Sequence, residues 1–266
     1  PDSWAIRDEK IASPEEPPTQ VADIAVRSDG SVVVVYGDGD HIRFSIRSAS
    51  GKWRTSDEID GGGVAGLSGP SLVLGGSDTV HLAYTTSDGK AWYRQLSSDN
   101  QLSPKTLIAE ALGKESEAVG SILPLVYLPD SREVSIIYRS SNGSLWERRY
   151  KEDRQTLSGA VRVTRRAVVQ NAVDSDQTGA DAVGFKNDVH VLFIDEASGK
   201  LLHTRRDATG SWSEPRRCGD ERPVQWVRGA LVEQTKGGLA YGYVIDAGSF
   251  GGSGMNYYRE LPLAAP

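Results

Sequence analysis

Cysteine is nearly absent from this sequence of 266 residues, which contains one, Cys218. A single thiol excludes a framework of intrachain disulfides. That cysteine and the four histidines show neither CxxC nor HExxH spacing, so the sequence predicts no metal centre and no cofactor. Asp38-Gly39-Asp40 and Asp174-Ser175-Asp176 could ligate calcium through oxygen, but each pattern is more typical of an ordinary turn.

Long apolar runs and blocks of one charge are absent too. The net charge is -6 and the basic residues are scattered, so no basic stripe could neutralise nucleic-acid phosphates. No apolar run approaches the roughly 20 residues that span a bilayer. We therefore expect neither nucleic acid nor a membrane as a partner, and nothing in the sequence indicates the oligomeric state.

Two features favour a secreted protein. The sequence begins at Pro1 without methionine, as a chain does after a leader has been removed. Asn142-Gly143-Ser144 is a sequon for N-glycosylation. We expect secretion, or passage through the secretory pathway, on these two observations.

An internal repeat dominates the rest of the sequence. Five runs of five residues are apolar at the first, third and fifth positions, and the last of these is aromatic. This period of two predicts strands with one buried face. Consecutive aromatics lie 48, 54, 55 and 50 residues apart, a period typical of propeller blades. The five runs end at Tyr36, Tyr84, Tyr138, Phe193 and Tyr243.

Each repeat contains several predicted strands. An apolar stretch and a turn precede each run, as at Ser28-Asp29-Gly30, and a second turn can follow it, as at Ser87-Asp88-Gly89. Asp-Gly pairs provide the tight reversals that antiparallel hairpins need. A third strand is predicted at residues 42–46, 91–96, 145–150, 201–205 and 255–259, and a fourth begins near a tryptophan such as Trp53 or Trp212.

The fifth repeat ends without a fourth strand, whereas the N-terminus supplies Ser3-Trp4-Ala5-Ile6 before any first strand. We predict that residues 3–12 form the outer strand of the last blade, which would remove exposed sheet edges. The predicted fold is all-β: one domain over residues 1–266, a five-bladed β-propeller with four-stranded antiparallel blades. A β-sandwich or an open array is the alternative, but a sandwich explains neither the five-fold register of the aromatics nor the Trp4 strand.

The order of an alternating strand, a glycine turn and a strand carrying glutamate resembles the fungal fucose-specific lectins, which are propellers. The likeness is closest at Gly143-Ser144-Leu145-Trp146-Glu147, which is similar to that family's Gly-x-Ile-Arg-Glu. The resemblance implies a sugar clamped by an arginine in the second strand, a glutamate 12 residues later and an aromatic ring. Glu147 is the only retained glutamate, so we expect a diverged protein that has lost this clamp. The arginine position holds Val33, His81, Ser135, His190 and Ala240.

A single ligand site is expected at the mouth of the central channel, because the loops entering the innermost strands differ while the strands repeat. Asp23 and Asp181 occupy equivalent positions where those strands start. Two carboxylates there could raise each other's pKa or hold a cation, or each could accept hydrogen bonds from the entering loop. The other predicted contacts are Gln20 and Gln225 to orient a carbonyl, Arg228 to polarise it, Trp226 to cover an apolar partner (or to pack between blades), and Ser71.

The first functional hypothesis is an enzyme with a small-molecule substrate. The sequence is similar to fungal biosynthetic propellers that catalyse hetero-Diels–Alder coupling, which implies a natural-product cyclase without metal or covalent nucleophile. Such chemistry needs a shaped cavity that aligns two partners. The predicted catalytic groups are Arg228, Gln225, Asp181 and Asp23.

Two alternatives involve carbohydrate. One is a glycan-binding lectin with a rebuilt sugar site, in which Tyr93, Trp146, Glu147 and Arg148 contact the ligand on the blade surface. The other is a glycosidase or polysaccharide lyase that uses Asp23 and Asp181 as its acids. An inverting glycosidase needs two carboxylates about 6.5–9.5 Å apart, a distance that sequence does not provide.

Overall fold

The fold is all-β. The computed structural model describes residues 11, 22–54, 57–62, 69–110, 123–140, 142–169, 179–219, 223–227, 232–233, 239–245 and 255–261. In these ranges the regular structure consists of strands β1 to β21 and one 3₁₀ turn, η1 (Gly76–Asp78). No helix in this part of the chain is long and apolar enough to cross a membrane.

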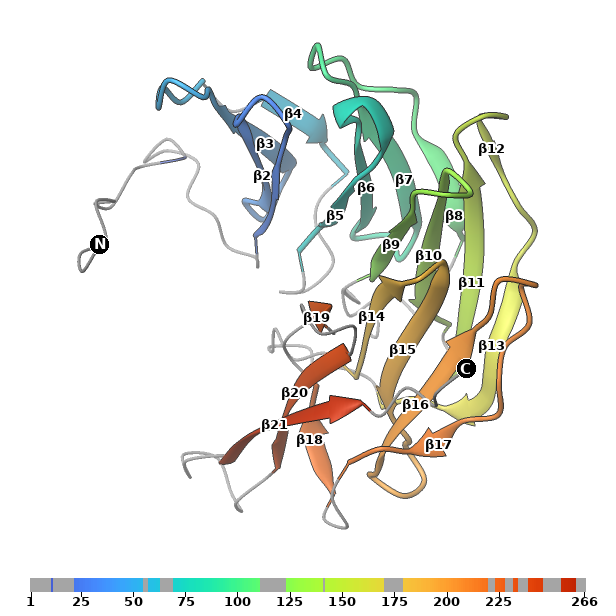
Figure 1. The fold of residues 1–266 in the computed structure, drawn as a ribbon. Coiled ribbons are helices and arrows are strands. Elements are labelled where there is room, and N and C mark those ends of the chain that lie inside the picture. Colours follow the sequence, from blue (N-terminus) through green and yellow to red (C-terminus); the bar gives the residue numbers. More distant parts are fainter. Residues whose placement is uncertain are drawn as a thin grey trace.

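The strands form five antiparallel sheets, numbered here 1 to 5 in chain order (Figure 1). Sheet 1 contains β1 (Asp23–Val26), β2 (Val32–Gly37), β3 (Ile42–Arg47) and β4 (Asp57–Asp60). Sheet 2 contains β5 (Ser71–Leu74), β6 (Val80–Thr85), β7 (Ala91–Leu96) and β8 (Thr106–Ala109). Sheet 3 contains β9 (Leu125–Leu128), β10 (Glu133–Arg139), β11 (Ser144–Lys151), β12 (Thr156–Leu157) and β13 (Val161–Ala167).

Sheets 4 and 5 complete the described structure. Sheet 4 contains β14 (Ala180–Phe185), β15 (Asp188–Ile194), β16 (Leu201–Arg206) and β17 (Arg216–Arg217). Sheet 5 contains β18 (Val224–Trp226), β19 (Val232–Glu233), β20 (Leu239–Ile245) and β21 (Met255–Leu261). Both β18 and β19 pair with β20, so they occupy the same side of that strand.

The predicted order of four strands is present in sheets 1, 2 and 4. Sheet 3 has two strands, β12 and β13, paired with its third strand, and in sheet 5 no described strand pairs with the outer side of β21. The five alternating runs are the second strands β2, β6, β10, β15 and β20, and the third strands are β3, β7, β11, β16 and β21. The Asp-Gly turns at Gly30 and Gly89 place these glycines at φ angles of 81° and 78°. Residues with a side chain disfavour these positive angles, whereas glycine adopts them readily. Local turn chemistry and period two therefore account for the hairpins.

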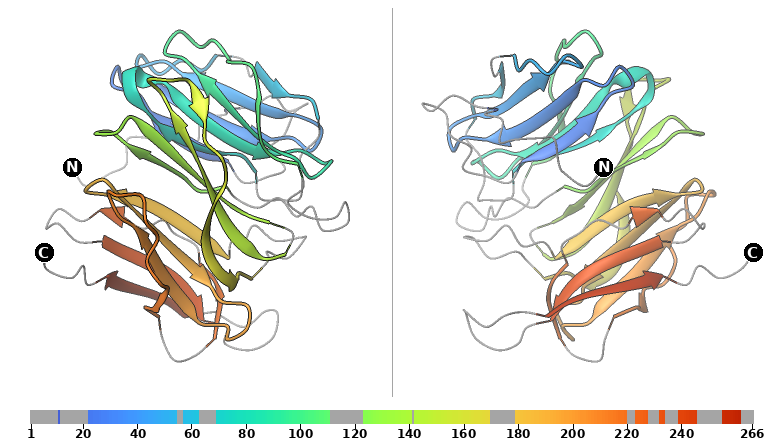
Figure 2. Two further views of the ribbon diagram at one scale, coloured as in Figure 1. Left: turned by 90° about the vertical axis from the view of Figure 1, so that its right-hand side faces the viewer. Right: turned by 60° about the vertical axis from the view of Figure 1, so that its left-hand side comes forward.

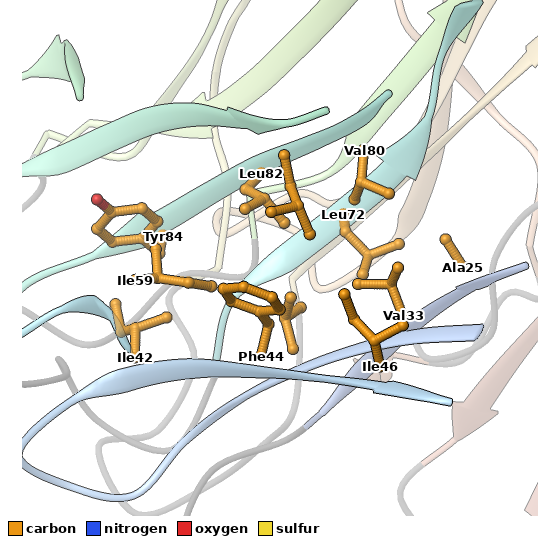
Figure 3. Close-up of a cluster of buried hydrophobic side chains, with 12 residues drawn as sticks. Ala25, Val33, Ile42, Phe44, Ile46, Ile59, Leu72, Val80, Leu82 and Tyr84 are labelled. Carbon is orange, nitrogen blue, oxygen red and sulfur yellow. The ribbon is translucent and has the colours of Figure 1, made fainter. Parts of the chain in front are cut away.

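The sheets follow one another around a common centre (Figure 1), and β1 contacts β5, β5 contacts β9 and β9 contacts β14. In the left view of Figure 2, sheets 1 and 2 lie at one end, sheet 3 in the middle and sheets 4 and 5 at the other end. Apolar side chains fill the spaces between neighbouring sheets. Figure 3 shows one such cluster, in which Phe44 and Ile46 of sheet 1 pack with Leu82 of sheet 2.

A recurrent contact ties neighbouring sheets together. Arg94 of β7 donates to the main-chain oxygen of Ile59 in β4, and Arg148 of β11 donates to that of Ile108 in β8 at 2.9 Å. The third-strand residue at the same register position in sheet 1 is Ser45, whose hydroxyl donates to the main-chain oxygen of Ile11 at 2.9 Å.

One face of β1 is left open by the described sheets. Ile24 and Val26 are each 59% exposed, whereas Leu72, at the position of Ile24 in sheet 2, is 9% exposed. The predicted closing strand, residues 3–12, lies outside the described residues except for Ile11.

Candidate functional site

Three predicted site residues start the innermost strands. Asp23, Ser71 and Asp181 each pair with the fourth residue of the alternating run, namely Val35, Ala83 and Leu192. They therefore hold the same register position in sheets 1, 2 and 4, and we call them the axial trio. The Asp23 carboxylate accepts a hydrogen bond from the amide of Leu72 at 2.8 Å, which places it beside Ser71.

The pKa values of both acids of the axial trio are raised, and burial is the largest cause for each. Burial raises the pKa of Asp181 to about 6; a hydrogen bond from the amide of Ala182 opposes this, and the charge of Asp23 adds a smaller increase. Burial also raises the pKa of Asp23, although amides of Leu72 and Ile24 donate to it. The amides that donate to the two acids belong to strands β1, β5 and β14, and not to the entering loops from which such hydrogen bonds were expected.

The rest of the predicted channel-mouth site is not described. Gln20 and Arg228 lie outside the described residues, as does the Asp174-Ser175-Asp176 turn. Gln225 and Trp226 belong to β18, but their side chains are outside the described part. In the described ranges, no group of three or more His, Cys, Asp or Glu side chains could hold a metal ion. The hydroxyl of Ser71 is buried without a hydrogen-bond partner.

The positions that correspond to the sugar clamp do come together in space. His81 Nδ1 lies 2.6 Å from the hydroxyl of Tyr93, 12 residues later. Ser135 donates to Glu147 at 2.6 Å with the same separation in sequence. In sheet 4, His190 Nδ1 lies 3.0 Å from Nε2 of His203. The spacing read from the sequence therefore identifies side chains that meet diagonally across the second and third strands, since the direct partner of His81 is Gln95 and that of Tyr93 is Ala83.

Glu147 is fully buried at the boundary between sheets 3 and 4. Its carboxylate accepts hydrogen bonds from Ser135 and from the indole of Trp212 and lies 3.2 Å from Nε of Arg206. Trp146 is half-buried, and its indole donates to the hydroxyl of Ser140 at 3.1 Å. These contacts make both residues part of the packing of sheet 3 in this structure.

A polar cluster at the boundary between sheets 2 and 3 gathers around Glu152, in the turn after β11; we call it the Glu152 cluster. Nε2 of His81 lies 3.0 Å from Oε1 of Glu152. The amide of Gly76 donates to the same oxygen at 3.1 Å. The Tyr127 hydroxyl and Nε of Arg132 each donate to Oε2 at 3.2 Å.

The inner side of the Glu152 cluster, at His81, is buried, and its outer rim, at Arg132, is exposed. His81 is fully buried, and burial lowers its pKa despite the neighbouring Glu152, so the imidazole is neutral at physiological pH. Burial opposes ionisation of Glu152, but hydrogen bonds from Arg132 and His81 bring its pKa below the ordinary value. The Arg132 side chain is 60% exposed and that of Glu152 10% exposed. A charged pair and a tyrosine ring thus meet at the surface.

Comparison of the whole chain with known proteins addresses the fold. No protein-family model matches the sequence, and no curated protein does. Among solved structures, the chain is similar to the BP39L lectin from Burkholderia pseudomallei, with a TM-score of 0.61 and 14% identity over 89% of this chain and 70% of that one. The chain has a β-propeller fold.

Two further structures share this fold. A variant of the Aleuria aurantia lectin, in complex with Fucα1-6GlcNAc, gives a TM-score of 0.51 and 15% identity over 77% of this chain and 63% of that one. An ulvan lyase of a polysaccharide lyase family, bound to a saccharide of glucuronic acid and sulfated rhamnose, gives a TM-score of 0.59. Its sequence is 11% identical over 89% of this chain and 68% of that one. These identities establish similarity of fold alone.

Sequence reasoning placed Tyr93 on the blade surface, but Tyr93 is 1% exposed and contacts His81 beneath the Glu152 cluster. It missed the outer residues of that cluster. Glu152 lies in a charged turn beyond the third strand, Tyr127 at the end of β9, and Arg132 in the turn before β10. No motif joins them, because they belong to different hairpins. The only sequence signal for this cluster was His81, which occupies the arginine position of the lectin clamp.

Proposed function

We propose that this protein is a carbohydrate-binding β-propeller whose ligand contacts the exposed rim of the Glu152 cluster. The observation that carries the proposal is the meeting of Arg132, Glu152 and Tyr127 at one surface. The exposed guanidinium of Arg132 can donate to sugar hydroxyls and the ring of Tyr127 can cover the apolar face of the sugar, while Glu152, whose two oxygens are engaged in four hydrogen bonds, holds both side chains in place. This is the chemistry of the lectin clamp, provided by other positions of the chain.

The structural neighbours support a saccharide ligand. Two are lectins and one is a polysaccharide lyase bound to its saccharide, as their names state. The boundary between sheets 3 and 4 is less suited to a ligand, because Arg206 occupies the space beside Glu147. We therefore propose about one glycan per chain at the Glu152 cluster. Neither the described residues nor these neighbours favour the cyclase hypothesis.

We also propose that the five sheets are the blades of a ring closed by residues 3–12. Arg94 and Arg148 each bond the main chain of the outer strand of the preceding sheet. Ser45 makes the corresponding bond to Ile11, which belongs to the segment expected to be the outer strand of the last blade. The exposed face of β1 at Ile24 and Val26 is the surface that the last blade would cover.

A glycan array followed by calorimetric titration tests the carbohydrate proposal. We expect binding to a subset of glycans with a stoichiometry near one. Arg132→Ala should weaken it at least tenfold, because it removes the exposed donor of the clamp. Arg154→Ala is the matched control, an exposed arginine whose nearest acid is its neighbour Asp153. A folded protein that binds no glycan, or binding that Arg132→Ala leaves unchanged, contradicts the proposal.

Glycans recovered after incubation with the protein show whether it also cleaves them. A glycosidase or lyase shortens the glycan, whereas a lectin returns it intact. Mass spectrometry of the glycans after incubation distinguishes the two outcomes without further variants.

A further inference from the structure

The carboxylate of the Glu152 cluster is fully occupied by the protein's own hydrogen bonds. Each of its two oxygens accepts two of them, at 3.0–3.2 Å, and the donors are Gly76, His81, Tyr127 and Arg132. A carboxylate offers about four acceptor positions in total. The proton of the Tyr127 hydroxyl is committed to Glu152 as well, so its oxygen is the only acceptor that these side chains leave over.

The guanidinium of Arg132 supplies the free donors of the cluster. Its Nε bonds Glu152, and in the described part of the chain no carboxylate or carbonyl oxygen accepts a hydrogen bond from its two terminal amino groups. Asp130 and Asp153 are the exposed acids of the two adjoining turns, but among the described residues neither forms an ion pair with Arg132; Asp153 pairs with Arg154 instead. The outer end of a planar fork of N–H groups is therefore left for a ligand.

Neutral and acidic sugars differ in what they require of such a site. Every sugar hydroxyl carries a proton, so a site for a neutral sugar must offer acceptors as well as donors. A carboxylate or sulfate group has acceptor oxygens only, and a guanidinium bonds two of them at once through parallel hydrogen bonds. A site with a free guanidinium and no free carboxylate suits the acidic ligand.

We infer, on the basis of the function proposed above, that the ligand is an acidic glycan whose uronic acid carboxylate or sulfate ester binds Arg132. Because Glu152 bonds Nε, the terminal amino groups at the other end of the guanidinium are the pair that meets the anion. The ring of Tyr127 covers the neighbouring apolar face of the sugar. Glu152 is a positioning residue, which orients Arg132 and Tyr127 and does not bond the sugar itself.

A glycan array with matched acidic and neutral members tests the inference. It carries uronic acid oligosaccharides with their carboxyl-reduced forms, and sulfated galactan oligosaccharides with their desulfated forms. We expect binding to acidic members only, and calorimetric titration should show an affinity about tenfold or more lower for the neutral form of the best ligand. Whether the uronic or the sulfated pair binds identifies the anionic group. Equal affinity for the two members of a pair overturns the inference.

Variants of Arg132 locate the contact. Arg132 has a φ angle of 47°, which asparagine adopts more readily than arginine, so Arg132→Asn should remove the guanidinium and leave the Tm unchanged. We expect it to weaken binding of the acidic glycan about tenfold or more, whereas Arg132→Lys, which keeps the charge without the fork, should weaken it about three- to tenfold. Arg154→Asn is the control, because that exposed arginine pairs with Asp153, and it should leave the affinity unchanged.

The outcomes separate this inference from the proposed function. Binding of neutral glycans that depends on Arg132 overturns the acidic ligand and leaves the carbohydrate site in place. Binding of acidic glycans that Arg132→Asn leaves unchanged, or an Arg132→Lys protein with native affinity, contradicts recognition by the guanidinium. A folded protein that binds no member of the array overturns both.

Discussion

Nε of Arg206, in β16, lies 3.2 Å from Oε1 of Glu147, in β11, and neither side chain is more than 4% exposed. The same guanidinium donates to Glu133 at 2.7 Å, and Lys151 lies 2.6 Å from the other oxygen of Glu133. One arginine of sheet 4 therefore bridges two buried glutamates of sheet 3, and Lys151 supplies a second positive charge to Glu133. The third-strand residue at its register position in sheet 3 is Tyr150, which instead packs on the tyrosine ring of Tyr93 in sheet 2.

Replacing Arg206 with an uncharged residue should make the folded protein less stable. We expect Arg206→Met to lower the free energy of unfolding by about 3–5 kcal/mol, because Glu147 and Glu133 are left buried without full compensation. Urea denaturation measures the loss. Arg205→Met is the matched control: Arg205 is 48% exposed and pairs with Asp188, an arrangement worth about 0–1 kcal/mol. Equal losses in both variants would show that the buried ion pairs contribute no more than an exposed one.

Gly75 allows the turn before β6 to approach the Glu152 cluster closely. A Cβ atom at Gly75 would lie 2.1 Å from Nε2 of His81 and 2.8 Å from Oε1 of Glu152. Gly75→Ala should therefore destabilise the fold by about 1–3 kcal/mol and weaken glycan binding, because His81 must move.

Gly159→Ala is the control for that change, since a Cβ there has nothing within 4 Å. It should alter stability by less than about 0.5 kcal/mol, as surface substitutions usually do. The two variants are compared by chemical denaturation and by titration with any glycan that the array identifies. A fully stable Gly75→Ala protein would mean that the turn and His81 are not packed as described.

The histidine pair of sheet 4 should make stability depend on pH. Burial, and then the neighbouring His203 and Arg205, lower the pKa of His190 to about 3, and burial lowers that of His203 to about 4. Because histidines of the unfolded chain protonate near pH 6.5, the unfolded state takes up protons first as the pH falls. Stability is thus fully present above pH 6.5 and should decline between pH 6.5 and 4, by up to about 1.4 kcal/mol per pH unit for each histidine.

Denaturation at several pH values measures this decline. The double variant His190→Gln/His203→Gln removes both titrating groups and should flatten the curve between pH 6.5 and 4. If the double variant loses stability as steeply as the native protein, other groups cause the dependence.

The N-terminal segment should be needed for stability. Deleting residues 1–12 removes the proposed outer strand of the last blade and the oxygen of Ile11 that Ser45 bonds. We expect a fall in Tm and aggregation through the exposed edge, measured by scanning calorimetry and size-exclusion chromatography. Ser45→Ala alone should lower the free energy of unfolding by about 1 kcal/mol. A truncated protein that stays monomeric with an unchanged Tm would refute closure by this segment.

The hairpins could be predicted from the sequence because their causes are local. Apolar residues at every second position determine which face of β2 or β6 is buried, and Asp-Gly pairs such as Asp88-Gly89 determine where the chain reverses. The repeat of this pattern predicted the number and order of the hairpins. The contact of His81 with Tyr93 could also be expected, because the two residues lie diagonally across neighbouring strands of one hairpin.

Contacts between sheets could not be predicted in this way. His81 and Glu152 are 71 residues apart, and Glu133 and Arg206 are 73 apart. Every boundary between sheets has similar apolar residues, so hydrophobic pattern does not distinguish them. Which polar side chain of the next sheet reaches a given histidine or glutamate depends on the angle and register at which two twisted sheets pack. Glu147 illustrates the difference: a local motif marks it as a sugar ligand, and packing of the next sheet makes it the buried partner of Arg206.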